Sequence, residues 1–189
     1  MKKIFTLFLG SLFSLAAFSQ VRISQVYGGG GNAGATYTQD FVEIFNAGSS
    51  AVIIGDWSVQ YASAVGPGGA GNWQVAPIPA ATSLGAGKYY LIALQVGGAV
   101  GVALPTPDAT TTTINMSASA GKIALVNNIT ALNGTTACSA AGVIDVIGYG
   151  ATATCFEGAA AVTTGITNAQ SILRAANGCT DAGPPALQL

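Results

Sequence analysis

The sequence predicts an all-β domain of the sandwich or barrel type, and three observations support this prediction. The chain of 189 residues contains 26 Gly and 7 Pro, which are typical of turns. Between the turns lie short runs rich in β-branched and apolar residues, the usual composition of strands. No stretch carries the long apolar stripe at 3.6-residue spacing that marks an amphipathic helix. Half of the residues are apolar, so the chain can bury a core and is not expected to be disordered.

Residues 1–19 are predicted to be a cleavable signal peptide. Lys2 and Lys3 form a basic start, an apolar stretch follows, and Ala17 and Ser19 place small residues where a signal peptidase cuts. The apolar stretch is short for a membrane span of about 20 residues, so an N-terminal anchor is the less favoured alternative. No later segment is expected to span a membrane. We therefore expect a secreted protein, extracellular or at the cell surface, and the short leader indicates a bacterial source.

The segments predicted to form strands lie between Gly, Asn and Pro residues along the chain. In chain order they are Val21–Tyr27, Asp40–Asn46, Ala51–Tyr61, Lys88–Val96, Lys122–Asn127, Val143–Tyr149 and, as a strand or a helical turn, Gln170–Arg174. In the third segment Trp57, Val59 and Tyr61 alternate with polar residues, which predicts a half-buried strand. Lys88–Val96 is nearly all apolar, which predicts a central strand covered on both faces.

The composition excludes several classes of function. The chain has no His, so Ser-His-Asp, Cys-His and His-ligated zinc chemistry cannot arise within it. Its net charge is −1, and without the leader four basic residues face seven acidic ones, a net charge of −3. No basic stripe is present, so direct nucleic-acid binding is not expected. The run Gly28–Gly31 precedes a loop and a strand rather than a helix, so it is interpreted as a surface loop and not as a phosphate cradle.

The acidic residues give weak signals for a site. Asp40 and Glu43 are the closest pair, and their odd spacing places them on opposite faces of a strand unless the strand bulges. The favoured interpretation is that one acid caps a loop while the other is paired or solvated. The alternative, a metal-dependent hydrolase, requires at least three loop carboxylates to converge on a cation, from the set Asp40, Asp56, Asp108, Asp145, Glu157 and Asp181. We predict no catalytic, cofactor-binding or metal-binding residues and no cofactor.

The three cysteines predict a disulfide because an exported chain meets an oxidising environment. Three pairings are possible among Cys138, Cys155 and Cys179. Cys138 and Cys155 flank the strand Val143–Tyr149, and closing that loop could contribute about 3 kcal/mol. This pairing is favoured, with Cys179 free or bonded elsewhere. A catalytic Cys is disfavoured because it would need an activating base.

Several stretches, taken together and in order, resemble the lamin tail domain in the form carried by secreted bacterial proteins. They are VRISQVYGGGGNAGATYTQDFVEIFN (21–46), GDWSVQYASA (55–64), SLGAGKYYLIAL (83–94), LPTPDAT (104–110), NMSASAGKIALVN (115–127), VIDVIGYG (143–150), CFEG (155–158) and SILR with NGCTD (171–181). The resemblance implies an immunoglobulin-like β-sandwich over residues 20–181 that lacks catalytic residues. Family members with Cys at the places of Cys138 and Cys155 make that disulfide more plausible. The family usually continues beyond NGCTD, whereas residues 182–189 here suggest a short irregular tail, as if the chain were truncated.

These observations favour an exported, non-catalytic interaction module that binds a protein or polymer outside the cell or at its surface. A second hypothesis is an accessory domain of a secreted nuclease or phosphatase whose catalytic part is absent from this chain. The metal-dependent hydrolase is the third and least favoured. On the first two hypotheses the chain itself is not an enzyme.

Overall fold

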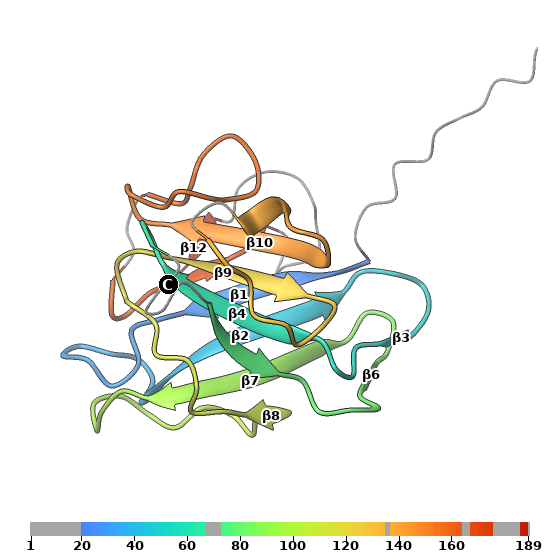
Figure 1. The fold of residues 1–189 in the computed structure, drawn as a ribbon. Helices are drawn as coiled ribbons and strands as arrows, with labels where there is room; N and C mark the ends of the chain where they lie inside the picture. The colour runs from blue at the N-terminus through green and yellow to red at the C-terminus, as the bar shows by residue number, and fades with distance from the viewer. Residues whose placement is uncertain (1–19, 67–72, 135–136, 164–166, 176–185, 189) are drawn as a thin grey trace, which may run out of the picture.

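Strands dominate the computed structural model, which describes residues 20–66, 73–134, 137–163, 167–175 and 186–188 (Figure 1). One sheet has six strands in the order β12-β11-β1-β2-β7-β8, a second has four in the order β10-β9-β4-β5, and β3 pairs with β6. The predicted signal peptide, residues 1–19, lies outside the described residues. The elements are β1 (Val21–Tyr27), β2 (Gln39–Asn46), β3 (Val52–Ile53), β4 (Ser58–Ser63), β5 (Gln74–Pro77), β6 (Ser83–Leu84), β7 (Tyr89–Val96), β8 (Ala109–Thr110), β9 (Gly121–Val126), the 3-10 turn η1 (Ala137–Ser139), β10 (Val143–Tyr149), β11 (Ser171–Leu173) and β12 (Ala186–Gln188).

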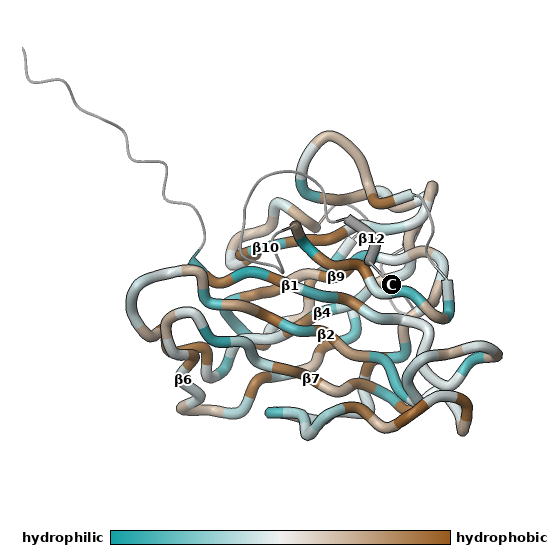
Figure 2. The backbone as a smooth tube through the Cα atoms, turned by 180° about the vertical axis from the view of Figure 1, so that it is seen from behind, coloured by the Kyte–Doolittle hydropathy of each residue, from teal (hydrophilic) through white to brown (hydrophobic). Residues whose placement is uncertain are grey.

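The two larger sheets pack face to face around one apolar core. Val42 and Ile44 of β2 and Ile92 of β7 meet Val59 of β4 and Ile123 of β9 in a single cluster of buried side chains. Val42 and Ile44 of β2 alternate with outward residues, and Val21, Ile23 and Val26 of β1 also enter this core, with a register shift between Ile23 and Gln25. Figure 2 shows apolar and polar positions interspersed along these strands. Burying each large aliphatic side chain stabilises the fold by about 1.5–3 kcal/mol. The predicted all-β sandwich is confirmed, and its layers are consistent with an immunoglobulin-like fold.

The four-stranded sheet is also covered on its outer face. Trp73, Leu132 and Ala137 form a second apolar cluster there with residues of β9 and β10. The prediction that the strand ending at Tyr61 is half-buried was therefore wrong, because its polar face is buried as well. Ser58 Oγ donates to Asn128 O at 2.6 Å, and the Gln60 amide both donates to Thr130 O at 2.9 Å and accepts from Leu132 N at 2.8 Å. These bonds satisfy the polar side chains that the loop covers.

Strand β7 is less buried than its sequence predicts. Tyr90, Ile92 and Leu94 are buried in the core, but Tyr89 on the outer face is 41% exposed. On the side of β7 away from β2, the pairing strand found among the described residues is the two-residue β8. The expectation that 88–96 is covered on both faces was wrong because Tyr89 and Val96 are exposed and Leu91 is only partly covered, although Ala93 on the outer face is buried.

The segment 111–116 connects the two sheets along one side of the sandwich. Gln95 N of β7 donates to Ile114 O at 3.1 Å, and Thr113 Oγ1 donates to Val75 O of β5 at 2.6 Å. The side chain of Ile114 is fully buried in the core. This segment therefore links the edge of one sheet to the edge of the other without itself being a strand.

The C-terminal part of the described chain adds two short strands to the six-stranded sheet. Ser171–Leu173 is a strand, which decides between the two predictions for 170–174. Ala186–Gln188 forms β12 and pairs with it, so this part of the tail predicted to be irregular is extended and paired. The remaining residues of 182–189 lie outside the described part. Within the described residues, no helix is long and apolar enough to cross a membrane.

Candidate binding surface

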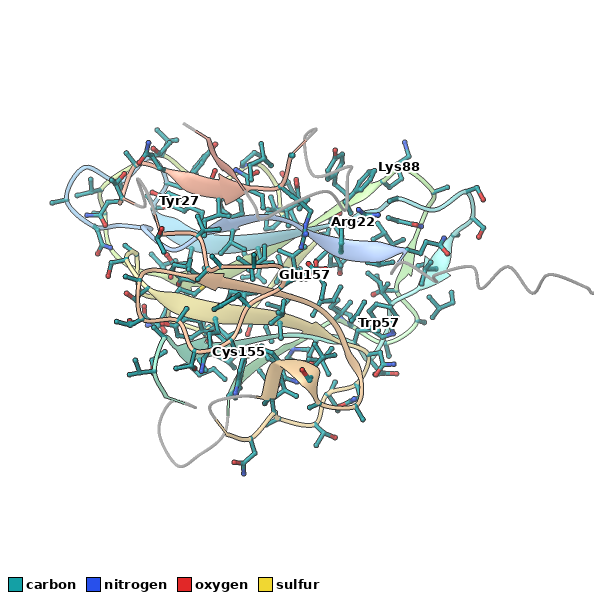
Figure 3. The ribbon with its side chains drawn as sticks, turned by 90° about the horizontal axis from the view of Figure 1, so that it is seen from above. Arg22, Tyr27, Trp57, Lys88, Cys155 and Glu157 are labelled. Carbon is teal, nitrogen blue, oxygen red and sulfur yellow. A yellow bond between two sulfur atoms is a disulfide. The ribbon has the colours of Figure 1, made fainter. Side chains whose placement is uncertain are left out.

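The predicted disulfide between Cys138 and Cys155 is present, with the two Cα atoms 5.9 Å apart. Cys138 belongs to η1, before β10, and Cys155 lies on the loop that follows β10 (Figure 3 labels Cys155). The two bonded cysteines are 17 positions apart in the sequence, and Cys155 packs in the second apolar cluster. Cys179 lies outside the described residues.

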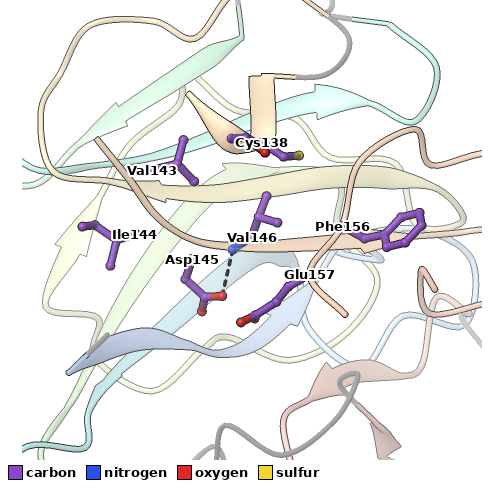
Figure 4. A pocket seen from close by; sticks show the side chains of 8 residues that line it. Cys138, Val143, Ile144, Asp145, Val146, Phe156 and Glu157 are labelled. Carbon is purple, nitrogen blue, oxygen red and sulfur yellow. Dashed lines mark hydrogen bonds between the residues drawn. The ribbon is translucent and has the colours of Figure 1, made fainter. Parts of the chain in front are cut away.

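A pocket of about 210 Å³ lies beside this disulfide (Figure 4). Cys138, Val143 and Phe156 contribute to its wall together with two acids, Asp145 and Glu157. Asp145 Oδ1 accepts a hydrogen bond from Val146 N at 2.8 Å, the dashed line in Figure 4. The two acids point to the same side of β10 in this view.

Arg174 forms ion pairs with both of these acids. Its Nη2 lies 2.8 Å from each carboxylate oxygen of Asp145, and its Nη1 lies 3.1 Å from Glu157 Oε2. The Arg174 residue is only 2% exposed. Burial raises the pKa of Asp145 to about 6, the positive charge of Arg174 opposes that rise, and Glu157 adds to it. The pair is therefore a buried charge contact whose partners satisfy each other.

The same two side chains also bond to the backbone of β1. Asp145 Oδ2 accepts from Ile23 N at 2.6 Å, and Arg174 Nε donates to Ile23 O at 3.0 Å. Strand β11 pairs with β1 only at Gln25 and Val26, so it does not reach Ile23. The side chains take the place of a neighbouring strand at this residue. We interpret Asp145 and Arg174 as structural, because their polar groups are used in holding β10 against β1.

The structure confirms the interpretation of Asp40 and Glu43. Asp40 is buried and caps the glycine loop by accepting from Gly30 N at 2.9 Å, and it also accepts from Met116 N at 3.0 Å. Burial raises its pKa to about 6, and the two backbone bonds oppose the rise. Glu43 instead accepts from Ser24 Oγ at 2.6 Å. The register of β2 against β7 shifts between Gln39 and Phe41, but this irregularity does not direct the two acids to a common partner.

The other predicted acids are not gathered into a metal centre among the residues that the structure describes. No three His, Cys, Asp or Glu side chains of those residues are placed to hold a metal ion together. Asp145 and Glu157 meet at Arg174, while Asp40 binds backbone amides elsewhere. Asp181 lies outside the described residues.

The outer face of the six-stranded sheet carries two neighbouring pockets that share Gln25 and Tyr37, and we call them together the Tyr37 groove. One pocket, of about 160 Å³, is completed by Tyr27, Thr36, Ala169 and Ser171. The other, of about 110 Å³, is completed by Phe41, Glu43, Leu91, Leu104 and Pro105. Both are smaller than sites for drug-sized ligands, roughly 300–1,000 Å³. Their sizes suit individual side chains or sugar units of a longer ligand.

Three aromatic rings support the Tyr37 groove. Tyr27 stacks on Phe41 with ring centroids 5.5 Å apart, and Tyr37 meets both rings edge-on at 5.6 and 5.7 Å. The Tyr27 hydroxyl accepts from Thr36 N at 3.0 Å and donates to Asn168 O at 2.5 Å. Such edge-on and offset contacts are favourable, at about 0.5–1.5 kcal/mol each. They fix the position of Tyr37 at the point where the pockets meet.

Two glycine-rich loops hold the end of the groove in place. Val102 N donates to Thr36 O at 2.9 Å, and Thr38 N donates to Val102 O at 3.0 Å. Further along, a Cβ on Gly97 would lie 2.0 Å from Gly30 O, so the loops approach more closely than side chains would allow. The run Gly28–Gly31 thus serves loop packing, in agreement with its interpretation as a loop.

Sequence reasoning did not find the Tyr37 groove. The alternation in DFVEIFN places Phe41, Glu43 and Phe45 on one face of β2, and that signal was available. Leu104 and Pro105 come from a loop far along the chain, and no local pattern indicates that they cover the same face.

These features define a β-sandwich in which Asp40 and Asp145 serve structural contacts and in which the Tyr37 groove lies on the outer face of the six-stranded sheet. The family model described as Lamin Tail Domain matches residues 14–173, and the chain belongs to this family. The domain is typically used for protein interaction. No curated protein matches the chain significantly.

Proposed function

We propose that this protein is an exported, non-catalytic interaction module that binds another protein or a polymer through the Tyr37 groove. The observation that carries the proposal is the groove itself, where the partly buried ring of Tyr37 lines two small neighbouring pockets on the outer face of the sheet. Aromatic side chains with few rotamers supply contact area at low entropic cost, and they are enriched where proteins bind one another.

The electrostatics of the chain support a ligand that is neutral or positively charged. Without its leader the protein carries four basic and seven acidic residues. Glu43 brings a carboxylate into the groove, and neither pocket is lined by a Lys or Arg among the described residues. An anionic ligand such as a nucleic acid would find no cation there.

A binding assay with matched variants tests this function. The chain from Gln20 onward is immobilised and exposed to separated secreted proteins and surface polymers. Tyr37→Ala is expected to lose at least tenfold in affinity for the ligand. Tyr89→Ala is the matched control, because Tyr89 is exposed on the same sheet but lines neither pocket.

Two results would contradict the proposal. If the Tyr37→Ala variant and the unaltered chain retain the ligand equally, the groove is not the binding surface. Turnover of a substrate by the purified chain would show that it is an enzyme. Export is tested separately by mass spectrometry of the culture medium, where the expected N-terminus is Gln20.

A further inference from the structure

The smaller pocket of the Tyr37 groove combines an acid with apolar and aromatic walls. Glu43 stands opposite Leu91 of β7 and Gln25 of β1 in the sheet register. Leu104 and Pro105 cover it from the loop that precedes β8. A carboxylate placed among such walls is poorly hydrated, and it gains from a ligand that supplies both a positive charge and an apolar stem.

The charged neighbour that acts on Glu43 is another acid, Asp108, whereas Arg22 of the adjacent strand β1 stands opposite Phe45. Burial raises the pKa of Glu43, the bond from Ser24 opposes the rise, and the negative charge of Asp108 raises it further. Asp108 is itself held at this edge, because its Oδ2 accepts from Leu91 N at 2.8 Å. The described residues that line the pocket include no Lys or Arg. A cation entering the pocket would therefore contact the carboxylate of Glu43, and the negative charge of Asp108 lies nearby outside the lining.

The walls suit a compact cation on a flexible chain. Tyr37 and Phe41 present aromatic rings, and a cation near such a ring gains about 0.5–2 kcal/mol. The pocket volume of about 110 Å³ is that of a side chain rather than of a cofactor. An ammonium group on a short alkyl stem meets each of these requirements, with its methylenes against Leu91 and Leu104.

We propose that the Glu43 pocket binds a primary alkylammonium group, presented as a Lys side chain by the protein that this module recognises. This assignment rests on the proposed binding function and names its ligand chemistry. Glu43 supplies the counter-charge, Leu91, Leu104 and Pro105 contact the stem, and Tyr37 borders the bound chain.

Nuclear magnetic resonance titrations of the purified, oxidised protein test the assignment with four probes. They are the blocked tripeptide Gly-Lys-Gly, the same peptide with norleucine in place of Lys, n-butylammonium chloride and a neutral disaccharide. We expect millimolar binding of the Lys peptide, with shifts centred on Glu43 and Leu91, and at least tenfold weaker binding of the norleucine peptide. n-Butylammonium should shift the same signals at higher concentration, because it lacks the peptide backbone.

Glu43→Gln is expected to abolish the preference for Lys over norleucine. Asp56→Asn, an exposed acid outside the groove, is the matched control and should keep it. The dispersion of the amide spectrum shows whether each variant is folded, and Leu104→Ala provides a second variant that should weaken both peptides. Affinity for the Lys peptide should rise with pH as Glu43 ionises, because only the carboxylate carries the charge.

Other outcomes overturn the assignment. Equal binding of the Lys and norleucine peptides would define a purely apolar pocket. Binding of the disaccharide alone would favour a glycan. Tighter binding of n-butylammonium than of the Lys peptide would favour a free amine, and shifts at many acids would indicate non-specific cation binding. The Tyr37→Ala assay above does not depend on the charge of the ligand, so these results would leave the binding function standing.

Discussion

Arg174 and Asp145 join the two sheets of the sandwich, with Arg174 Nη2 at 2.8 Å from both carboxylate oxygens. Asp145 belongs to β10 of the four-stranded sheet, and Arg174 directly follows β11 of the six-stranded sheet. Both also bond to the backbone of Ile23. One ion pair therefore supports a sheet edge and the contact between layers.

Arg174→Met is expected to destabilise the protein by about 3–5 kcal/mol, because it leaves the buried carboxylate of Asp145 without its partner. Urea unfolding followed by tryptophan fluorescence measures the loss. Lys88→Met removes an exposed cation and should change stability by less than about 0.5 kcal/mol. A loss for Arg174→Met as small as that of the control would contradict the structural role.

Asp40→Asn is expected to reduce the dependence of stability on pH between about 4 and 6, a window in which Asp145 also contributes because burial raises its pKa to about 6 as well. The pKa of Asp40 is about 6 in the folded state against 3.8 ordinarily, so within this window the folded protein keeps a proton that the unfolded chain releases. The free energy of unfolding therefore falls as pH rises through the window, by about 2–3 kcal/mol from this group, and is level above it. Urea midpoints at several pH values test the slope. Asp56→Asn should retain the slope, whereas parallel profiles for Asp40→Asn and the unaltered protein would refute the prediction.

Replacing Cys138 and Cys155 together by Ser is expected to lower stability by about 3 kcal/mol, because the bond closes a loop with a sequence separation of 17. Thermal unfolding measures the change, and the unaltered protein after reduction should match the double variant. Cys179→Ser, which leaves both of these cysteines in place, should retain the full stability. Identical midpoints for oxidised and reduced protein would show that the bond contributes nothing.

Gly97→Ala is expected to destabilise the protein by about 1–3 kcal/mol, because its Cβ would lie 2.0 Å from Gly30 O in the facing backbone. The amide signals of Thr36 and Val102 should shift with the displaced loop. At Gly85 the nearest atom to an added Cβ is the flexible Lys88 side chain at 3.3 Å, so Gly85→Ala should be tolerated. Equal stability of the two variants would rule out the tight loop contact.

Local patterns predicted most of the longer strands, because alternation and turn residues act over a few positions. The predicted strand 51–61 is instead divided into β3 and β4, and the short strands β5, β6 and β8 were not predicted. The roles of Asp40 and Glu43 followed from their odd spacing, and the cysteine pair followed from its place on either side of one strand. The contact between the Arg174 side chain and the backbone of Ile23 could not be predicted in this way. Ile23 lies 151 positions from Arg174, and the register shifts beside Ile23 in β1 and beside Asp145 in β10 leave no mark in the local sequence.

Burial of outward-facing residues was also beyond local patterns. Ser58 and Gln60 look solvent-facing in the alternation, yet loop residues such as Leu132 cover them. Leu91 looks like a core residue, yet it lines a groove. In both strands the covering segment comes from elsewhere in the chain, so the pleat sets the direction of each side chain but not what lies above it.

The bonds from Asp145 and Arg174 to Ile23 have a consequence for the behaviour of the protein in a concentrated solution. A chain with charged residues at only 7% has little electrostatic repulsion to keep its copies apart. An unpaired backbone N–H and C=O at the edge of a sheet can pair with a strand of another molecule and so lead to aggregation. Because side chains already occupy those groups at Ile23, that position is closed to a foreign strand.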